Sequence, residues 1–150
     1  SRVNLENKKI FLTTGETFSA RALIIATGVR RRKLNAEGED IFAGKGIIES
    51  GKKDAAKAAG KRVVIVGGGD AAIENALILA AAAESVKIVH RRREFRARAE
   101  FLQQARANPK IDFVTPYILT KIAGNDEIEN VEIKNVKTGK IVSVPAEAIL

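Results

Sequence analysis

An α/β fold is predicted for this chain by three features of its sequence. Residues 63–80 pass from a run of β-branched residues through three glycines into an alanine-rich stretch, which is the order strand, turn, helix. A second apolar strand candidate follows, and the spacing fits a parallel βαβ unit of about 30 residues. Beyond residue 116, short alternating segments joined by turn residues indicate an antiparallel meander. The prediction is a small parallel sheet with flanking helices and an antiparallel appendage.

Composition supports one ordinary packed domain. The chain has 150 residues, of which 45% are hydrophobic and 29% charged. No apolar stretch reaches the roughly 18 residues of a membrane-spanning helix, and the polar start lacks the apolar core of a signal peptide, so a cytoplasmic protein without a membrane partner is expected. The chain has no cysteine, which excludes a disulfide framework, a thiolate metal site and a redox dithiol within it. The formal net charge of +8 favours an anionic partner.

The first predicted elements are β-strands. Residues 9–19, KIFLTTGETFS, alternate in polarity around a Thr-Gly pair, which predicts a hairpin. Residues 22–28, ALIIATG, form an apolar run that suits a strand covered on both faces. Residues 29–46 show no sustained period and mix charges with glycines, so a connector between two modules is expected.

Helix formers and strand formers alternate in the centre of the chain. Residues 52–60 are rich in helix formers, with Gly60 as a stop signal. A strand at 62–66 and a helix over about 70–83 surround the three glycines, and SVKIVH at 85–90 supplies the next strand.

A second helix and a third parallel strand complete the predicted parallel unit. Residues 94–107 carry one apolar stripe and end at Asn108-Pro109, which predicts a helix. IDFVTP at 111–116 is predicted to be the third parallel strand. The segments YILTKIAG, IENVEIKNV and KIVSVP, with a turn at 137–139, form the expected meander.

The glycine turn satisfies the pattern G-x-G-x-x-A, which is typical of a Rossmann-like dinucleotide-binding domain. Gly67 permits the sharp turn, Gly69 admits a pyrophosphate and Ala72 lets helix and strand pack closely. Unpaired N–H groups and the dipole at the helix start attract an anion, and Asp70 is expected to cap the helix. The candidate cradle comprises Gly67, Gly68, Gly69, Asp70, Ala71 and Ala72. A glycine-rich connection that binds nothing is the alternative.

A basic run follows the second strand and points to NADPH. NAD sites place an acid about 20 positions after the glycines, whereas NADP sites place cations there for the 2′-phosphate. Here the strand end carries cations and no acid, and each charge-assisted bond is worth about 1.5–3 kcal/mol. The candidate phosphate contacts are His90, Arg91, Arg92 and Arg96. The alternatives are a solvated basic surface and a nucleic-acid patch; because Phe95 is the only aromatic residue in the run, no nucleic acid is expected.

The chain resembles the low-molecular-weight thioredoxin reductase family of pyridine nucleotide-disulfide flavoproteins. The resemblance is carried by three segments in this order: ALIIATG, GKRVVIVGGGDAAIENAL and VKIVHRRREFRAR. The combination of GGGDxA with HRRxxFRA is more specific than either motif alone, and the resemblance covers essentially the whole chain. Such enzymes interleave an FAD domain with an inserted NADPH domain. The resemblance implies that 1–32 flanks the FAD domain, that 33–146 is the NADPH domain and that 147–150 starts a return strand to the FAD domain.

The resemblance also implies roles for single residues. The family's ATG segment, which runs near the flavin, falls on Ala26, Thr27 and Gly28. Its HRRxxxR motif, which binds NADPH, falls on the four candidate phosphate contacts.

One family feature is absent from the matching positions. The redox motif C-A-T-C-D falls on residues 50–54, where Ser50 and Lys53 replace the two cysteines and cannot form a disulfide. Asp54 matches the acid that serves the dithiol, and it is either a structural remnant or a functional group. No catalytic residue and no metal site are predicted.

The predicted function is therefore a cysteine-free variant of this flavoprotein family. Because the FAD fingerprint is missing, the chain is expected to be a fragment that lacks FAD itself. The parent enzyme would pass a hydride from NADPH to FAD and then to an acceptor other than an in-chain dithiol. The resemblance extends to cysteine-free ferredoxin or flavodoxin NADP reductases, which favours a small acidic electron carrier as partner. A homodimeric parent is left open. The alternatives are a non-catalytic pyridine-nucleotide sensor and a basic nucleic-acid-binding domain.

Overall fold

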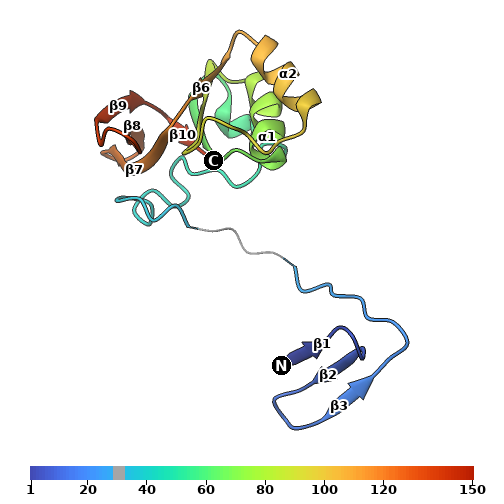
Figure 1. Cartoon of the computed structure of the whole chain (residues 1–150). Coiled ribbons are helices and arrows are strands. Elements are labelled where there is room, and N and C mark those ends of the chain that lie inside the picture. The colour runs from blue at the N-terminus through green and yellow to red at the C-terminus, as the bar shows by residue number, and fades with distance from the viewer. Residues whose placement is uncertain (29–32) are drawn as a thin grey trace. The chain divides into compact units, whose positions relative to one another are not determined.

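The computed structural model describes residues 1–28 and 33–150 (Figure 1). The chain divides into two compact units, unit 1 (Ser1–Arg32) and unit 2 (Lys33–Leu150). The start of the expected connector, residues 29–32, lies outside the described residues. Within the described parts, no helix has the length and apolar character needed to cross a membrane.

Unit 1 contains a three-stranded antiparallel sheet. Its strands β1 (Arg2–Asn4), β2 (Lys9–Phe11) and β3 (Thr17–Ser19) lie in the order β1-β2-β3. The pairing of β2 with β3 confirms the hairpin expected at 9–19. The strand expected at 22–28 is wrong for this chain, since these residues form no strand and Ile24 is 94% exposed. A strand covered on both faces needs neighbours, and the described residues of unit 1 place none beside it.

A four-stranded parallel sheet forms the centre of unit 2. Its order is β10-β4-β5-β6, and every pair is parallel. The strands are β4 (Arg62–Val66), β5 (Ser85–Val89), β6 (Ile111–Val114) and β10 (Ala148–Ile149). The α/β fold class and the three predicted parallel strands are confirmed. For residues 147–150 the sequence predicts only the start of a return strand to another domain. The structure has a strand there, β10, and its connection to another domain stays a prediction.

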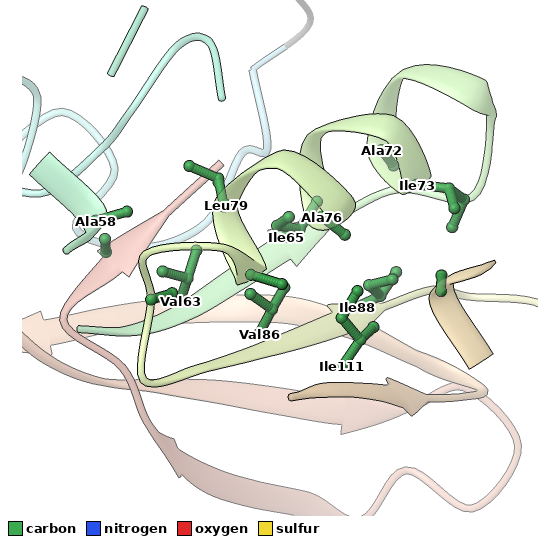
Figure 2. Packing of buried hydrophobic residues seen from close by; sticks show 14 of the residues in the cluster. Ala58, Val63, Ile65, Ala72, Ile73, Ala76, Leu79, Val86, Ile88 and Ile111 are labelled. Atoms are coloured by element: carbon green, nitrogen blue, oxygen red, sulfur yellow. The ribbon is translucent and has the colours of Figure 1, made fainter. Parts of the chain in front are cut away.

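Helices α1 (Asp70–Ala80) and α2 (Ala99–Ala107) cover one face of this sheet. Figure 2 shows the buried side chains of α1 packed over those of β4 and β5. The residues in this contact include Ile73, Ala76 and Leu79 from the helix and Val63, Ile65, Val86 and Ile88 from the strands. Because β4 and β5 are buried on both faces, their sequences read as continuous runs of apolar residues rather than as an alternation.

The predicted meander covers the other face. It consists of β7 (Tyr117–Gly124), β8 (Ile128–Asn135) and β9 (Ile141–Pro145), paired in that order and antiparallel. Its inner residues pack with Val64 and Val89 of the parallel sheet. The described part of the expected connector packs against the meander. Glu37 exchanges backbone hydrogen bonds with β7, and Phe42 is buried.

All three predicted helices are shorter in the structure, and the one expected over about 70–83 ends at Ala80. The helix expected at 52–60 is a single 3₁₀ turn, η1 (Ala55–Ala58). The helix expected at 94–107 begins only at Ala99. Residues 94–98 do not join the helix, because the N–H of Arg96 donates to the carbonyl of Gly68 at 2.8 Å. This backbone bond is made to the glycine turn and not within a helix.

Candidate functional site

The glycine turn connects β4 to α1, and its first glycine is required by packing. A Cβ atom on Gly67 would lie 2.9 Å from the Cβ of Ala72, closer than real Cβ atoms approach each other. This short distance agrees with the prediction that Ala72 lets helix and strand pack closely. The N–H of Gly67 donates to the carbonyl of Val89 at 3.1 Å, so the turn is also fixed to the end of β5.

Gly69 differs from its neighbour because nothing in the fold requires it. A Cβ atom built on Gly69 meets no atom within 4 Å, and its φ of −102° and ψ of 179° are open to any residue. Gly69 is the N-cap of α1, and the first N–H groups of a helix lack partners inside the helix. Open space in front of unpaired donors is the arrangement that an anion such as a pyrophosphate needs.

Gly68 is required for a different reason, which the motif alone does not indicate. A Cβ atom on Gly68 would overlap the imidazole ring of His90. That ring also lies 5.0 Å from the ring of Phe95, whose edge-on contact with Phe113 is 5.2 Å between centroids. His90 therefore packs between the glycine turn and an aromatic pair. The predicted parallel pairing of the strands at 62–66 and 85–90 is the signal that could have placed Gly68 beside His90. Its register pairs Val66 with Val89, the last residues of the two strands.

Charge is concentrated around the same histidine. Burial lowers the pKa of His90 below its ordinary value, and the cationic Arg91, Arg92 and Arg96 lower it further. A backbone hydrogen bond at Glu94 acts in the opposite direction. All three arginines are exposed, and among the ion pairs of residues 1–28 and 33–150 none involves them. Three arginines without an ion pair among the described residues therefore follow the end of β5, and the backbone of one of them, Arg96, is bonded to the glycine turn.

The lowered pKa of His90 predicts a loss of stability on acidification. Below about pH 6.5 the unfolded chain binds a proton at this histidine, whereas the folded chain binds it only at lower pH. The free energy of unfolding of the wild type should therefore fall more steeply between about pH 7.5 and about pH 5 than that of His90→Gln. Denaturant unfolding at several pH values measures this, and His90 is the only histidine in the chain. Parallel curves for the two proteins would contradict the expectation.

Asp70 does not cap α1 as predicted. The helix begins at Asp70 itself, Gly69 is the N-cap, and no side chain makes a cap hydrogen bond. Instead, Asp70 Oδ1 accepts a hydrogen bond from the backbone N–H of Arg98 at 2.7 Å. Its Oδ2 lies 3.3 Å from Arg98 Nε. The alanine at 71 is exposed on the first turn of the helix.

Residues 50–54, which match the redox motif, form a turn that is held by hydrogen bonds. Asp54 Oδ2 accepts hydrogen bonds from the N–H groups of Glu49 and Ser50, both at 3.1 Å, and Oδ1 pairs with Lys57 at 2.8 Å. Lys57 and the two N–H donors hold the pKa of the Asp54 carboxyl below its usual value. The N–H of Lys53 donates to Ser50 Oγ at 3.3 Å. These contacts favour the structural alternative for Asp54.

A second contact in this turn is not predictable from the sequence motif. Asn75 of α1 accepts a hydrogen bond from the N–H of Gly51 at 2.7 Å, and a Cβ atom on Gly51 would overlap its side chain. The turn is therefore tied to the helix that starts at the glycines. Ala26, Thr27 and Gly28 are exposed and belong to unit 1, and their place near a flavin stays a prediction.

Comparison with known proteins gives a consistent result. The family model described as pyridine nucleotide-disulphide oxidoreductase matches residues 1–150. The thioredoxin reductase of Mycolicibacterium smegmatis is 39% identical over 132 residues, which cover 88% of this chain and 42% of that protein. The ferredoxin--NADP reductase 2 of Oceanobacillus iheyensis is 35% identical over 151 residues, covering 97% of this chain and 45% of that protein.

Solved structures show the same similarity. The thioredoxin reductase of Lactococcus lactis superposes with a TM-score of 0.82 at 35% identity, covering 95% of this chain and 47% of that one. The thioredoxin reductase of Giardia duodenalis gives a TM-score of 0.82 at 38% identity, covering 94% and 46%. The chain thus spans less than half the length of these relatives.

Proposed function

Because the chain belongs to the pyridine nucleotide-disulphide oxidoreductase family, we propose that unit 2 binds NADPH in a flavoprotein oxidoreductase related to the thioredoxin reductases. NADPH bound there would supply a hydride for reduction of a flavin, as the relation to flavoprotein oxidoreductases implies. Unit 2 supplies binding and orientation.

One observation carries this proposal: the basic run after β5 is bonded to the glycine turn. The ring of His90 packs on Gly68, and the N–H of Arg96 donates to the Gly68 carbonyl at 2.8 Å. In a Rossmann-like domain the turn serves the pyrophosphate and the next strand end serves the adenosine ribose. The adjacency of the glycine turn and the end of β5 supports a site in which these two segments hold the two halves of a dinucleotide.

The charges at the strand end favour NADPH over NADH. Arg91, Arg92 and Arg96 lack acidic partners among the described residues, so their guanidinium groups are free to bind the 2′-phosphate. The open space at Gly69 leaves room for the pyrophosphate near the first N–H groups of α1. The ring of His90, whose pKa is lowered by burial, packs on Gly68 of the turn.

The acceptor that we propose is a small acidic electron carrier of the ferredoxin or flavodoxin kind. The chain has no cysteine, and Ser50 and Lys53 occupy the positions of the family's dithiol, so this segment cannot relay electrons to a disulfide. One of the similar proteins is named ferredoxin--NADP reductase, although most are named thioredoxin reductase. The net charge of +8 suits an acidic partner.

Two measurements test the proposal. Calorimetric titration of the chain should show binding of NADPH that is tighter than binding of NADH, and DNA should not compete. Stopped-flow assays of the full-length flavoprotein should show NADPH oxidation that depends on a ferredoxin or flavodoxin. Equal affinity for NADH would overturn the cofactor assignment, and turnover with thioredoxin alone would overturn the acceptor assignment.

A further inference from the structure

The segment between β5 and α2, which we call the basic loop (residues 91–98), is attached to the start of α1 by one carboxylate. Asp70 accepts a hydrogen bond from the backbone N–H of Arg98 at 2.7 Å and pairs with its Nε at 3.3 Å. One side chain thus holds both the main chain and the side chain of a residue 28 positions away. Hydrogen bonds to an ionised acceptor are about twice as strong as neutral ones.

The other attachments of the basic loop lead to the same turn. Arg96 bonds through its N–H to Gly68, and His90, which immediately precedes the loop, packs on Gly68. Arg91 and Arg92 therefore lie between two points fixed to the turn. Their distance from the glycines is set by these contacts and not by a regular helix, because α2 begins only at Ala99.

Asp70 also places a negative charge where an anionic ligand is expected. A carboxylate in the first turn of a helix stabilises the helix but repels a pyrophosphate bound at the same end. The guanidinium of Arg98, which also pairs with Glu100, compensates part of this charge. It is held in place by Glu100 at 3.1 Å and by the ring of Phe101 at 4.1 Å from its centroid.

We propose that Asp70 and Arg98 are positioning residues that set the cofactor preference of this site. Asp70 fixes the end of the basic loop that carries Arg96 for the 2′-phosphate, and Arg98 offsets part of the charge of Asp70 so that the pyrophosphate is repelled less. The inference rests on the proposed NADPH site. It assigns different effects to the two partners of one ion pair, which a merely structural role would not produce.

The two single variants should separate these effects in calorimetric titrations of the chain with NADPH and with NADH. Asp70→Ala releases the Arg98 end of the basic loop and removes a negative charge, so NADPH affinity should fall about ten-fold while NADH affinity is unchanged or higher. Arg98→Ala keeps the backbone bond but leaves Asp70 uncompensated, so both affinities should fall alike, by about three- to five-fold. Asp70→Asn, which keeps an acceptor oxygen, should retain most of the preference for NADPH.

The double variant Asp70→Ala/Arg98→Ala tests the charge argument. It should restore NADH binding to the wild-type level, because no carboxylate remains to repel the pyrophosphate, but it should not restore NADPH binding. Asp112→Ala is a matched control, since it removes an exposed ion pair with Lys87 at 2.9 Å from the same domain. This control should change neither affinity.

The possible failures are distinguishable. If the wild type does not prefer NADPH, the proposed function is wrong. If the wild type prefers NADPH and Asp70→Ala keeps the same ratio of affinities with an unchanged circular dichroism spectrum, the positioning role is wrong and the site stands. Equal losses of both cofactors in Asp70→Ala would equally overturn the positioning role.

Discussion

Replacing both Arg91 and Arg92 with alanine is expected to weaken NADPH binding by about 100-fold and to leave NADH binding within about three-fold of the wild type. The two cofactors differ only in the 2′-phosphate, so groups that bind this phosphate discriminate between them. A charge-assisted hydrogen bond is worth about 1.5–3 kcal/mol, and exposure of these side chains favours the lower figure for each. Two such bonds give about 3 kcal/mol, which corresponds to about 100-fold in affinity.

Calorimetry at one fixed ionic strength measures both affinities, since salt screens exposed phosphate contacts. Lys134→Ala/Lys137→Ala is the matched control, because it removes the same amount of positive charge from exposed positions near the end of β8. The control should leave both affinities unchanged. Equal losses of NADPH and NADH in the arginine variant would show that the arginines act through general attraction and not through the 2′-phosphate.

Much of unit 2 could be predicted because its signals are local. The β-branched runs of β4 and β5, the glycine breaks and the alternating segments of the meander each reflect a short stretch of sequence. The order strand, turn, helix, strand then determines a parallel unit with one handedness of connection. The family resemblance extended this to the proposed cofactor.

The errors arise where distant residues override local preference. Residues 94–98 contain good helix formers, but Gly68 and Asp70 bind their backbone N–H groups and delay the start of α2 to Ala99. Propensity scales treat each residue alone and contain no term for such contacts. Residues 22–28 fail differently: their apolar run is typical of a buried strand, but the described residues of unit 1 contain no strand that pairs with them.

The three glycines of the turn illustrate how far a motif can be interpreted. The pattern indicates that small residues are needed, and the structure shows that the need differs at each position. Gly67 and Gly68 are required by Ala72 and His90, which are parts of the protein. Gly69 faces open space, so a requirement for glycine there must come from something outside the described protein atoms.

Gly69→Val is therefore expected to abolish binding of both NADPH and NADH while the fold persists. The backbone at Gly69 is extended, a conformation that β-branched residues adopt readily, and the added side chain meets no atom within 4 Å of its Cβ. The side chain instead fills the space through which the pyrophosphate would approach the N–H groups of α1. The loss should exceed about 100-fold for both cofactors, because the pyrophosphate and its charged hydrogen bonds are common to them. Calorimetry measures the affinities, and thermal unfolding followed by circular dichroism measures the fold.

Gly67→Val provides the contrasting case within the same turn. Its Cβ would lie 2.9 Å from the Cβ of Ala72, so the first turn of α1 must move and the protein should be destabilised by about 1–3 kcal/mol. Loss of binding in Gly67→Val would thus accompany a lower unfolding temperature, whereas in Gly69→Val it would not. A Gly69→Val protein that still binds NADPH would show that no pyrophosphate lies against this turn, since a side chain at that position leaves it no room.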